Sequence, residues 1–225
     1  NLTCGGRSCP NVEKVILKDT TFYTEYNVSD NFSTMFLYCP AKMIDIRGLK
    51  LTSTSAGVSY EAMFNECSNL TSIFGLDALG DYSHITSLCG MFYNCTSLTS
   101  VDLSFLDTSY VYSFSSMFYG CTNLLYANLS GWKILKYSSS SYSDLYFLGG
   151  LFNSCNKLKS LNINNWDFTG NHVSSLDNFY GYTGLGNCSS LESINASGWA
   201  LGSSIRSADY FLAGCSMKNL DLSNW

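Results

Sequence analysis

Apolar residues recur at fixed distances after a series of cysteines. Counting from Cys95, they follow at positions +3, +6 and +8, and Leu106 closes the unit at +11. After Cys67 the ladder stops at Ile73. Eight cysteines begin such a ladder, at steps of 26 to 34 residues: Cys9, Cys39, Cys67, Cys95, Cys121, Cys155, Cys188 and Cys215. A period in this range predicts a stacked array of repeating units.

The pattern within one unit predicts its local structure. Apolar and polar residues alternate around Val101, Asp102 and Leu103, which predicts a short strand with Val101 and Leu103 facing inward. A second apolar pair, such as Val111 and Phe114, predicts another extended segment in each unit. The Met-Phe-x-x-Cys segment is too short for an independent helix, so we expect a single helical or 3₁₀ turn there.

The repeat runs to the end of the chain and leaves no room for a second fold. We therefore predict one solenoid domain over residues 1–225, with about eight units and one continuous core. The residues predicted to form the core are Leu98, Val101, Leu103, Leu124, Leu129, Leu158, Leu161, Ile163, Trp132, Trp166 and Trp199. Residues 1–10 are expected to cap the first coil. The last ladder ends at Trp225 without a cap, so further sequence or another molecule is expected to cover it.

Two insertions interrupt the regular spacing. One lies between Trp132 and Leu145 and the other around residues 179–183, and insertions in solenoids form loops that often carry contacts. Tyrosine offers a large contact area at a small entropy cost. The candidate partner-binding residues are Tyr137, Tyr142, Tyr146, Tyr180 and Tyr182. The serine run in the first insertion also fits a low-complexity loop without a binding role.

The composition narrows the range of partners. Charged residues make up 13% of the chain, against roughly 25% in ordinary domains, and Ser, Thr, Asn, Gly and 16 Tyr take their place. This composition favours an adaptable contact surface. A net charge of -5 provides no basic stripe for phosphates, so we expect no nucleic-acid partner. No apolar run reaches the roughly 18 residues of a membrane span, so we expect no direct membrane insertion.

The cysteines predict buried free thiols rather than a disulfide framework. Equivalent side chains in stacked coils lie about 4.8 Å apart and point the same way, which fits disulfide geometry poorly. The thiols would act as small apolar groups, each donating weakly to a turn carbonyl. Cys4 and Cys89 lie off the column, and their pairing stays open. We expect no metal site, because no C-x₂-C pair occurs and His84 and His172 stand apart.

One polar column alternates with the inward residues of the ladders: Asp45, Asp102, Asn128, Asn162, Asn195 and Asp221. These outward side chains would form a ligand surface or a weak calcium site, or else a ladder whose members hydrogen-bond to one another. Of the Asn-x-Ser/Thr sequons, Asn27, Asn31 and Asn69 fall in expected turns and are the candidate N-glycosylation sites. No catalytic constellation and no cofactor motif rises above chance, so we predict a non-enzymatic protein.

The segments MFYNCTSLTSVDLSFLDTSYV and MFYGCTNLLYANLSGW resemble the BspA-type leucine-rich repeat. The resemblance implies a leucine-rich-repeat-like solenoid of right-handed coils of about 26–34 residues, β-rich, with parallel strands and short helical turns. It also implies a secreted or cell-surface protein concerned with attachment. We therefore predict an extracellular or cell-surface recognition or adhesion module with a protein or glycan ligand on another cell or matrix. The alternative is a structural protein that self-associates into a filament or surface coat.

Overall fold

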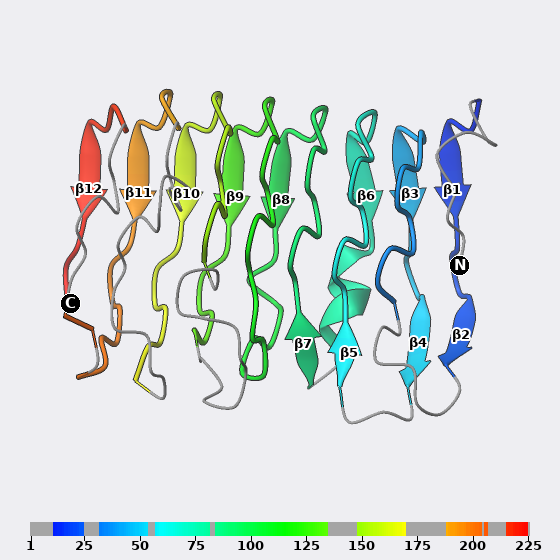
Figure 1. The fold of residues 1–225 in the computed structure, drawn as a ribbon, viewed down its shortest axis with the longest axis horizontal. Helices are drawn as coiled ribbons and strands as arrows, with labels where there is room; N and C mark the ends of the chain where they lie inside the picture. Colours follow the sequence, from blue (N-terminus) through cyan, green and yellow to red (C-terminus); the bar gives the residue numbers. More distant parts are fainter. Residues whose placement is uncertain are drawn as a thin grey trace.

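The computed structural model describes residues 11–24, 32–53, 57–81, 84–134, 148–169, 188–203, 205–206 and 215–224. These residues wind into a parallel β-solenoid, with the coils stacked along the long axis (Figure 1). One wall carries a row of three-residue strands: β1 (Lys14–Ile16), β3 (Met43–Asp45), β6 (Ser72–Phe74), β8 (Ser100–Asp102), β9 (Tyr126–Asn128), β10 (Ser160–Asn162), β11 (Ser193–Asn195) and β12 (Asn219–Asp221). The predicted β-rich repeat solenoid is confirmed.

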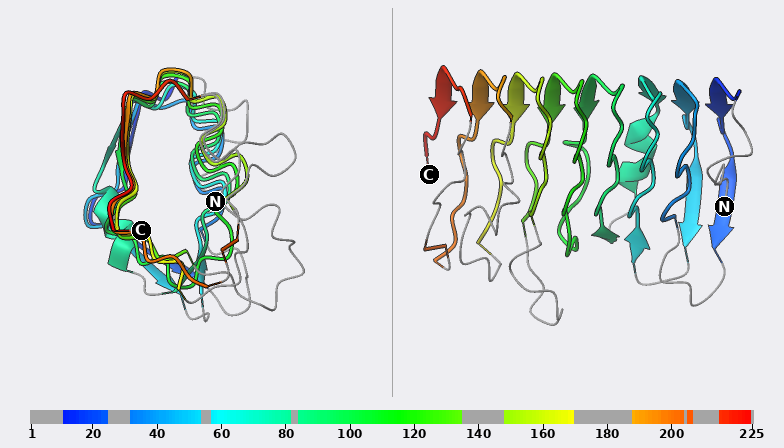
Figure 2. Two further views of the ribbon diagram at one scale, coloured as in Figure 1. Left: turned by 90° about the vertical axis from the view of Figure 1, so that its left-hand side faces the viewer. Right: turned by 45° about the horizontal axis from the view of Figure 1, so that its top comes forward.

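Equivalent residues of successive coils lie in register. Val101 of β8 pairs with Ala127 of β9, which pairs in turn with Leu161 of β10. Viewed along the long axis, the coils superimpose (Figure 2). Every residue predicted to form the core is buried, so the inward assignment is confirmed.

A second wall carries shorter stretches of sheet. β2 (Thr21–Thr24) pairs with β4 (Lys50–Ser53), and β5 (Val58–Ser59) pairs with β7 (Ile85–Ser87). Isolated parallel bridges continue the pairing between Ser87 and Ser113 and between Lys133 and Asp167. The predicted second extended segment, marked by pairs such as Ile85 and Leu88, is therefore present at β5 and β7, whereas β2 and β4 form a separate stretch of sheet.

The Met-Phe-x-x-Cys segments form a third wall that is not helical, so the expected helical or 3₁₀ turn is wrong. The Cys67 amide donates to the Phe64 carbonyl of its own coil (3.1 Å), whereas the Phe64 amide donates to the Met91 carbonyl of the next coil (2.8 Å). Ala62 and Glu66 have left-handed backbones, with φ of 52° and 59°. Amides that alternate between their own coil and the next one produce linked β-turns instead of a helix. The one 3₁₀ helix in the described ranges, η1 (Leu76–Asp81), lies elsewhere.

From Cys39 to Cys188 the cysteine column is buried and without disulfides, as predicted, whereas Cys215 is only partly buried. The Cys95 thiol donates to the carbonyl of Phe64 in the preceding coil (3.0 Å), and Cys67, Cys121, Cys155 and Cys188 repeat this contact. No disulfide joins the cysteines in the described ranges, Cys89 included. Burial raises the pKa of the Cys121 and Cys188 thiols to about 12.

Aromatic side chains form two further columns. The rings of Phe36, Phe64, Phe92, Phe118 and Phe152 stack with centroids 5.0 to 5.5 Å apart. Trp166 lies between Trp132 and Trp199, at 6.1 and 5.4 Å. Each of these three indoles donates to a carbonyl of the preceding coil. These columns tie the coils that contribute to them through side chains, in addition to the strand pairing.

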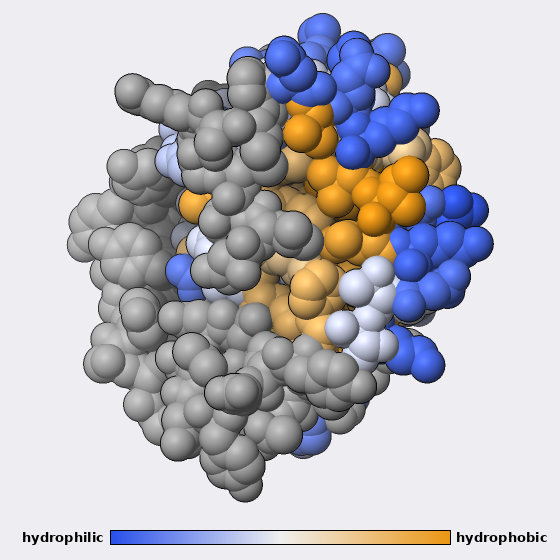
Figure 3. Space-filling view, turned by 90° about the vertical axis from the view of Figure 1, so that its right-hand side faces the viewer, coloured by the Kyte–Doolittle hydropathy of each residue, from blue (hydrophilic) through white to orange (hydrophobic). Residues whose placement is uncertain are grey.

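Apolar side chains gather on the end of the solenoid beside β1 (Figure 3). Ile16 is exposed there, while Val15 and Leu17 are partly buried against the core. The expected cap (residues 1–10) and Trp225 lie outside the described residues.

Candidate binding groove

The row of strands is interrupted between β6 and β8. Strands β1, β3 and β6 form one sheet, β8 to β12 form another, and no pairing joins β6 to β8. Figure 1 shows a wider space between these two strands than between the other neighbours in the row. The same two coils stay joined on the other walls, through the pairing of β5 with β7 and through the bond from the Phe64 amide to the Met91 carbonyl. The coils therefore separate at β6 and β8 while they stay joined at these other places.

The residues that follow β6 explain the separation. In the flanking coils the strand ends at an aspartate whose Oδ1 accepts the backbone amide two residues later, at 3.2 Å for Asp45 and 3.0 Å for Asp102. Phe74 occupies this position in β6 and cannot accept that bond. The chain instead turns at Gly75, with φ of 78°, and enters η1. Leu79 of η1 is fully buried, so the helix is anchored in the core and keeps the chain away from β8.

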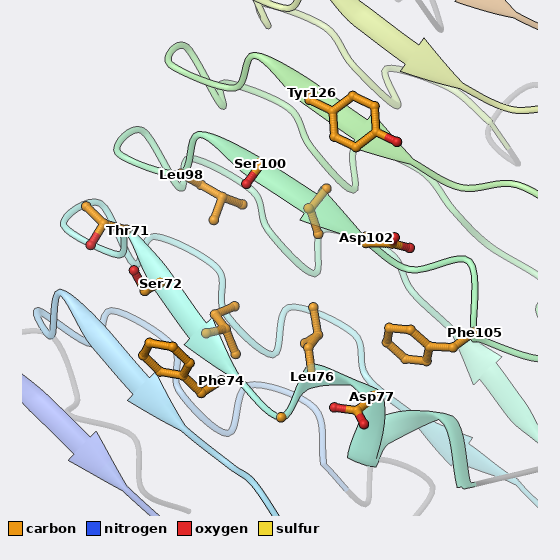
Figure 4. A pocket seen from close by; sticks show the side chains of 13 residues that line it. Thr71, Ser72, Phe74, Leu76, Asp77, Leu98, Ser100, Asp102, Phe105 and Tyr126 are labelled. Carbon is orange, nitrogen blue, oxygen red and sulfur yellow. The ribbon is translucent and has the colours of Figure 1, made fainter.

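The separation leaves a groove of about 530 Å³ between the two strands (Figure 4). We call it the split-sheet groove. Its apolar lining comes from Ile73, Leu76, Leu98 and Val101, of which Leu98 and Val101 belong to the buried core. This volume falls within the range of small-ligand pockets, roughly 300 to 1,000 Å³.

Three exposed aromatic side chains line the same groove. Phe74, Phe105 and Tyr126 are 45%, 36% and 39% exposed, and they come from β6, from the turn after β8 and from β9. The guanidinium carbon of Arg47 lies 5.6 Å from the centre of the Phe74 ring, a cation–π contact that helps to hold this ring. Large rings left partly in water beside an apolar floor are typical of contact surfaces.

The charged side chains that line the groove are the acidic residues Asp77 and Asp102. Burial acts to raise the pKa of Asp102, but hydrogen bonds from the Ser104 amide and hydroxyl and from Asn128 outweigh it, so the pKa lies below its usual value. Asp102 therefore stays ionised at neutral pH. No lysine or arginine belongs to the described lining, and Arg47 nearby is already paired with Asp45 at 2.6 Å.

The outward polar column forms the self-bonded ladder at its centre. The Asn128 side-chain amide donates to Asp102 (2.9 Å), and the Asn162 amide donates to Asn128 (2.9 Å). The side-chain oxygens of Asp102 and Asn128 accept these bonds, whereas calcium binding would require the same oxygens as ligands. In the part of the chain that the structure describes, no cluster of three or more His, Cys, Asp or Glu side chains is placed to hold a metal.

Asp45 differs from the other members of the outward column in its burial. Its residue is only 5% exposed, because the Arg47 side chain covers it with hydrogen bonds of 2.9 and 2.6 Å. The side-chain hydrogen bond from Arg47 is the main reason why the pKa of Asp45 falls from 3.8 to about 2. Asp45 therefore keeps its predicted outward place, but the Arg47 side chain covers it there.

Most of the predicted site residues lie outside the described residues: Tyr137, Tyr142, Tyr146, Tyr180, Tyr182, Asn27 and Asn31. Asn69 is described and exposed, and its Nδ2 donates to the Pro40 carbonyl at 3.2 Å. Nδ2 carries two hydrogens, of which N-glycosylation would replace one, and glycosylation at Asn69 remains a prediction. The described binding groove was not among the predicted sites, although Phe74 interrupts the Asp/Asn column and marks its position.

The sequence matches a family described as "Mycoplasma protein of unknown function, DUF285", over residues 30–147, 58–175 and 86–225. The chain belongs to this family. Successive DUF285 matches start 28 residues apart, the same step as from Cys39 to Cys67 and from Cys67 to Cys95, so the matches follow the repeat. No curated protein matches the sequence. Among the described residues of this DUF285 chain, no helix has the length and apolar character needed to cross a membrane.

Proposed function

We propose that this DUF285 chain is a non-enzymatic recognition module at the cell surface or outside the cell, and that the split-sheet groove holds its ligand. The observation that carries the proposal is the set of exposed rings of Phe74, Phe105 and Tyr126 around an apolar floor. When a ligand covers aromatic side chains that are partly in water, the burial of their apolar surface favours binding. The groove occurs where the regular repeat is broken.

The scaffold suits this role. Hydrogen bonds from Cys95, Trp166 and Asn128 to their preceding coils fix neighbouring coils against one another. A groove bounded by such coils needs little reordering when it binds, which favours affinity. The low charge and the many Ser, Asn and Tyr residues favour a protein or glycan ligand.

Closer kinship with BspA-type leucine-rich repeats is part of the same proposal, as is attachment to host, matrix or neighbouring-cell molecules. The tyrosines of the two insertions would supply a second contact surface. Self-association into a filament or coat is the competing function.

Binding to defined arrays tests the groove. The labelled parent chain is applied to an array of short linear peptides and to a glycan array, together with the double variant Phe105→Ala/Tyr126→Ala. The matched control is Tyr112→Ala, which removes a ring that is 38% exposed and does not line the groove. We expect the parent chain and the Tyr112→Ala control to bind the same ligands on the arrays, and the double variant to lose this binding.

Two results would overturn the proposal. The first is an absence of bound ligands on both arrays, and the second is binding that the double variant retains. Light scattering of the parent over a wide concentration range adds a separate reading. Steady growth of the particles with concentration would favour self-assembly over recognition of a separate ligand.

A further inference from the structure

We infer that the ligand of the split-sheet groove is an extended peptide, which inserts as an added strand between β6 and β8 and presents lysine or arginine on its outward face. This inference rests on the proposed function and names its ligand class. Three features carry it: the backbone edges of the two strands, the alternation of the lining side chains, and the charge of the groove.

The first edge belongs to β6. The Phe74 carbonyl accepts the Ile46 amide at 2.8 Å, so the polar groups of Phe74 point toward β3. Successive residues of a strand direct their amide and carbonyl groups to opposite sides. Ile73 therefore directs its backbone N–H and C=O into the groove. Within the described ranges, no backbone hydrogen bond joins Ile73 to β8.

The second edge belongs to β8 and faces the first. The Thr99 carbonyl accepts the Leu125 amide at 2.8 Å, so Thr99 directs its polar groups toward the β9 side. By the same alternation, Ser100 and Asp102 direct theirs toward β6. Two parallel edges with unpaired backbone groups that face each other match the two sides of one inserted strand. Main-chain hydrogen bonds of this kind provide affinity when a peptide adds to a sheet.

The lining side chains alternate in the way that an inserted strand requires. Leu98 and Val101 belong to the buried core, while the rings of Phe105 and Tyr126 lie at the exposed surface (Figure 4). Side chains of a strand point alternately to its two faces. A peptide with apolar residues at every second position would cover the floor with one face and contact the rings with the other.

The charge of the groove selects the outward residues of the peptide. Asp77 and the ionised Asp102 line it without a basic partner among the described lining residues. Lysine and arginine side chains can lie along aromatic rings and reach a carboxylate with the charged head. The contact of Arg47 with Phe74 at 5.6 Å shows that this ring accepts a guanidinium. A neutral glycan would contact the rings but would gain less from the carboxylates and could not pair in register with two backbone edges.

Fluorescence anisotropy with synthetic peptides tests the inference on the whole chain. The probe is an acetylated and amidated peptide of alternating valine and lysine. The peptides compared with it are a valine–glutamate peptide, a valine–serine peptide, and the valine–lysine peptide methylated on alternate backbone nitrogens. We expect the valine–lysine peptide to bind best and the valine–glutamate peptide to bind at least about tenfold more weakly. The N-methylated peptide should lose binding whether the valine nitrogens or the lysine nitrogens carry the methyl groups.

A pair of matched variants tests the charge. Asp77→Asn removes a groove carboxylate, whereas Asp107→Asn removes an exposed carboxylate outside the lining. We expect Asp77→Asn to weaken binding of the valine–lysine peptide by about two- to fivefold at low salt, the range of an exposed ion pair. Binding of the valine–serine peptide should not change, and Asp107→Asn should bind as the parent does. Slower hydrogen exchange of the Ile73 and Ser100 amides in the complex would locate the added strand.

The outcomes separate this inference from the proposed function. If the N-methylated peptides bind as well as the unmethylated valine–lysine peptide, the inference of strand insertion is wrong. If glycans bind in a way that depends on Phe105 and Tyr126 and no peptide binds, the peptide class is wrong and the groove remains a recognition site. If neither class depends on these two rings, both the inference and the proposed function fail.

Discussion

Trp166 offers a sharp test of how the coils hold one another. Its side chain lies between those of Trp132 and Trp199, is 2% exposed, and donates from Nε1 to the Leu129 carbonyl of the preceding coil at 2.6 Å. Trp166→Phe keeps an aromatic ring in the column but removes the donor and part of the ring area. We expect a folded protein of lower stability.

The size of the effect follows from two losses. A buried acceptor deprived of its donor costs about 1 to 3 kcal/mol. The removed ring atoms leave a small cavity and weaken the contacts with both neighbouring indoles, which costs about 1 kcal/mol more. We therefore expect the free energy of unfolding to fall by about 2 to 4 kcal/mol.

Urea unfolding followed by far-ultraviolet circular dichroism measures this change, because tryptophan fluorescence would itself be altered by the substitution. The dependence on urea should keep its slope, since the fold is retained. Tyr126→Phe changes an exposed aromatic and should stay within about 0.5 kcal/mol of the parent. If Trp166→Phe also stays within about 0.5 kcal/mol, the indole bonds do not hold the coils together as argued.

Three further predictions concern other columns. Leu161→Ala, in the buried core, should lower the free energy of unfolding by about 2 to 5 kcal/mol; parent-like stability in urea would contradict the inward assignment. The Cys121 and Cys188 thiols, buried and with pKa values of about 12, should resist alkylation in the native state at neutral pH and react in denaturant, as followed by mass spectrometry; native labelling at either residue would contradict their burial. Because the pKa of Asp45 is lowered from 3.8 to about 2, its contribution to stability is present above pH 3.8 and is lost as the pH falls through about 2. Asp45→Asn should remove this part of the decline in urea-unfolding free energy, and an unchanged decline would show that the pair with Arg47 is not its source.

The ladder after each cysteine predicted the core because the sequence repeats both the apolar spacing and the strand alternation. Leu98, Val101 and Leu103 are buried as predicted. The thiol bonds were also predictable, since a cysteine repeated at one register position must meet the same backbone group in every coil. Such predictions follow from features that recur at the same position of every repeat, and they do not depend on the loops between the repeats.

The third wall was predicted wrongly because a short Met-Phe segment carries no sign of where its amides point. A signal did exist in neighbouring units. Gly90 stands where Ala62 stands one unit earlier, and Gly120 stands where Glu66 stands two units earlier; all four have positive φ. Glycine adopts this backbone without strain, so its recurrence at these positions indicated left-handed turns.

The groove escaped prediction for a different reason. It depends on a pairing that β6 and β8 do not make, and a search for repeated features passes over the unit that lacks them. The ladder that stops at Ile73 and the phenylalanine at position 74 were the visible traces. The 3₁₀ helix that follows, with its buried Leu79, could be placed only with the structure in hand.

The split between β6 and β8 also makes the solenoid mechanically uneven. Neighbouring coils elsewhere in the row are joined by strand pairing, whereas these two are held only by their other walls. A force that stretches the molecule along its long axis would part it first at this joint. A strand that bonds to both edges would reinforce the weakest joint, so a bound ligand would make the whole rod harder to pull apart.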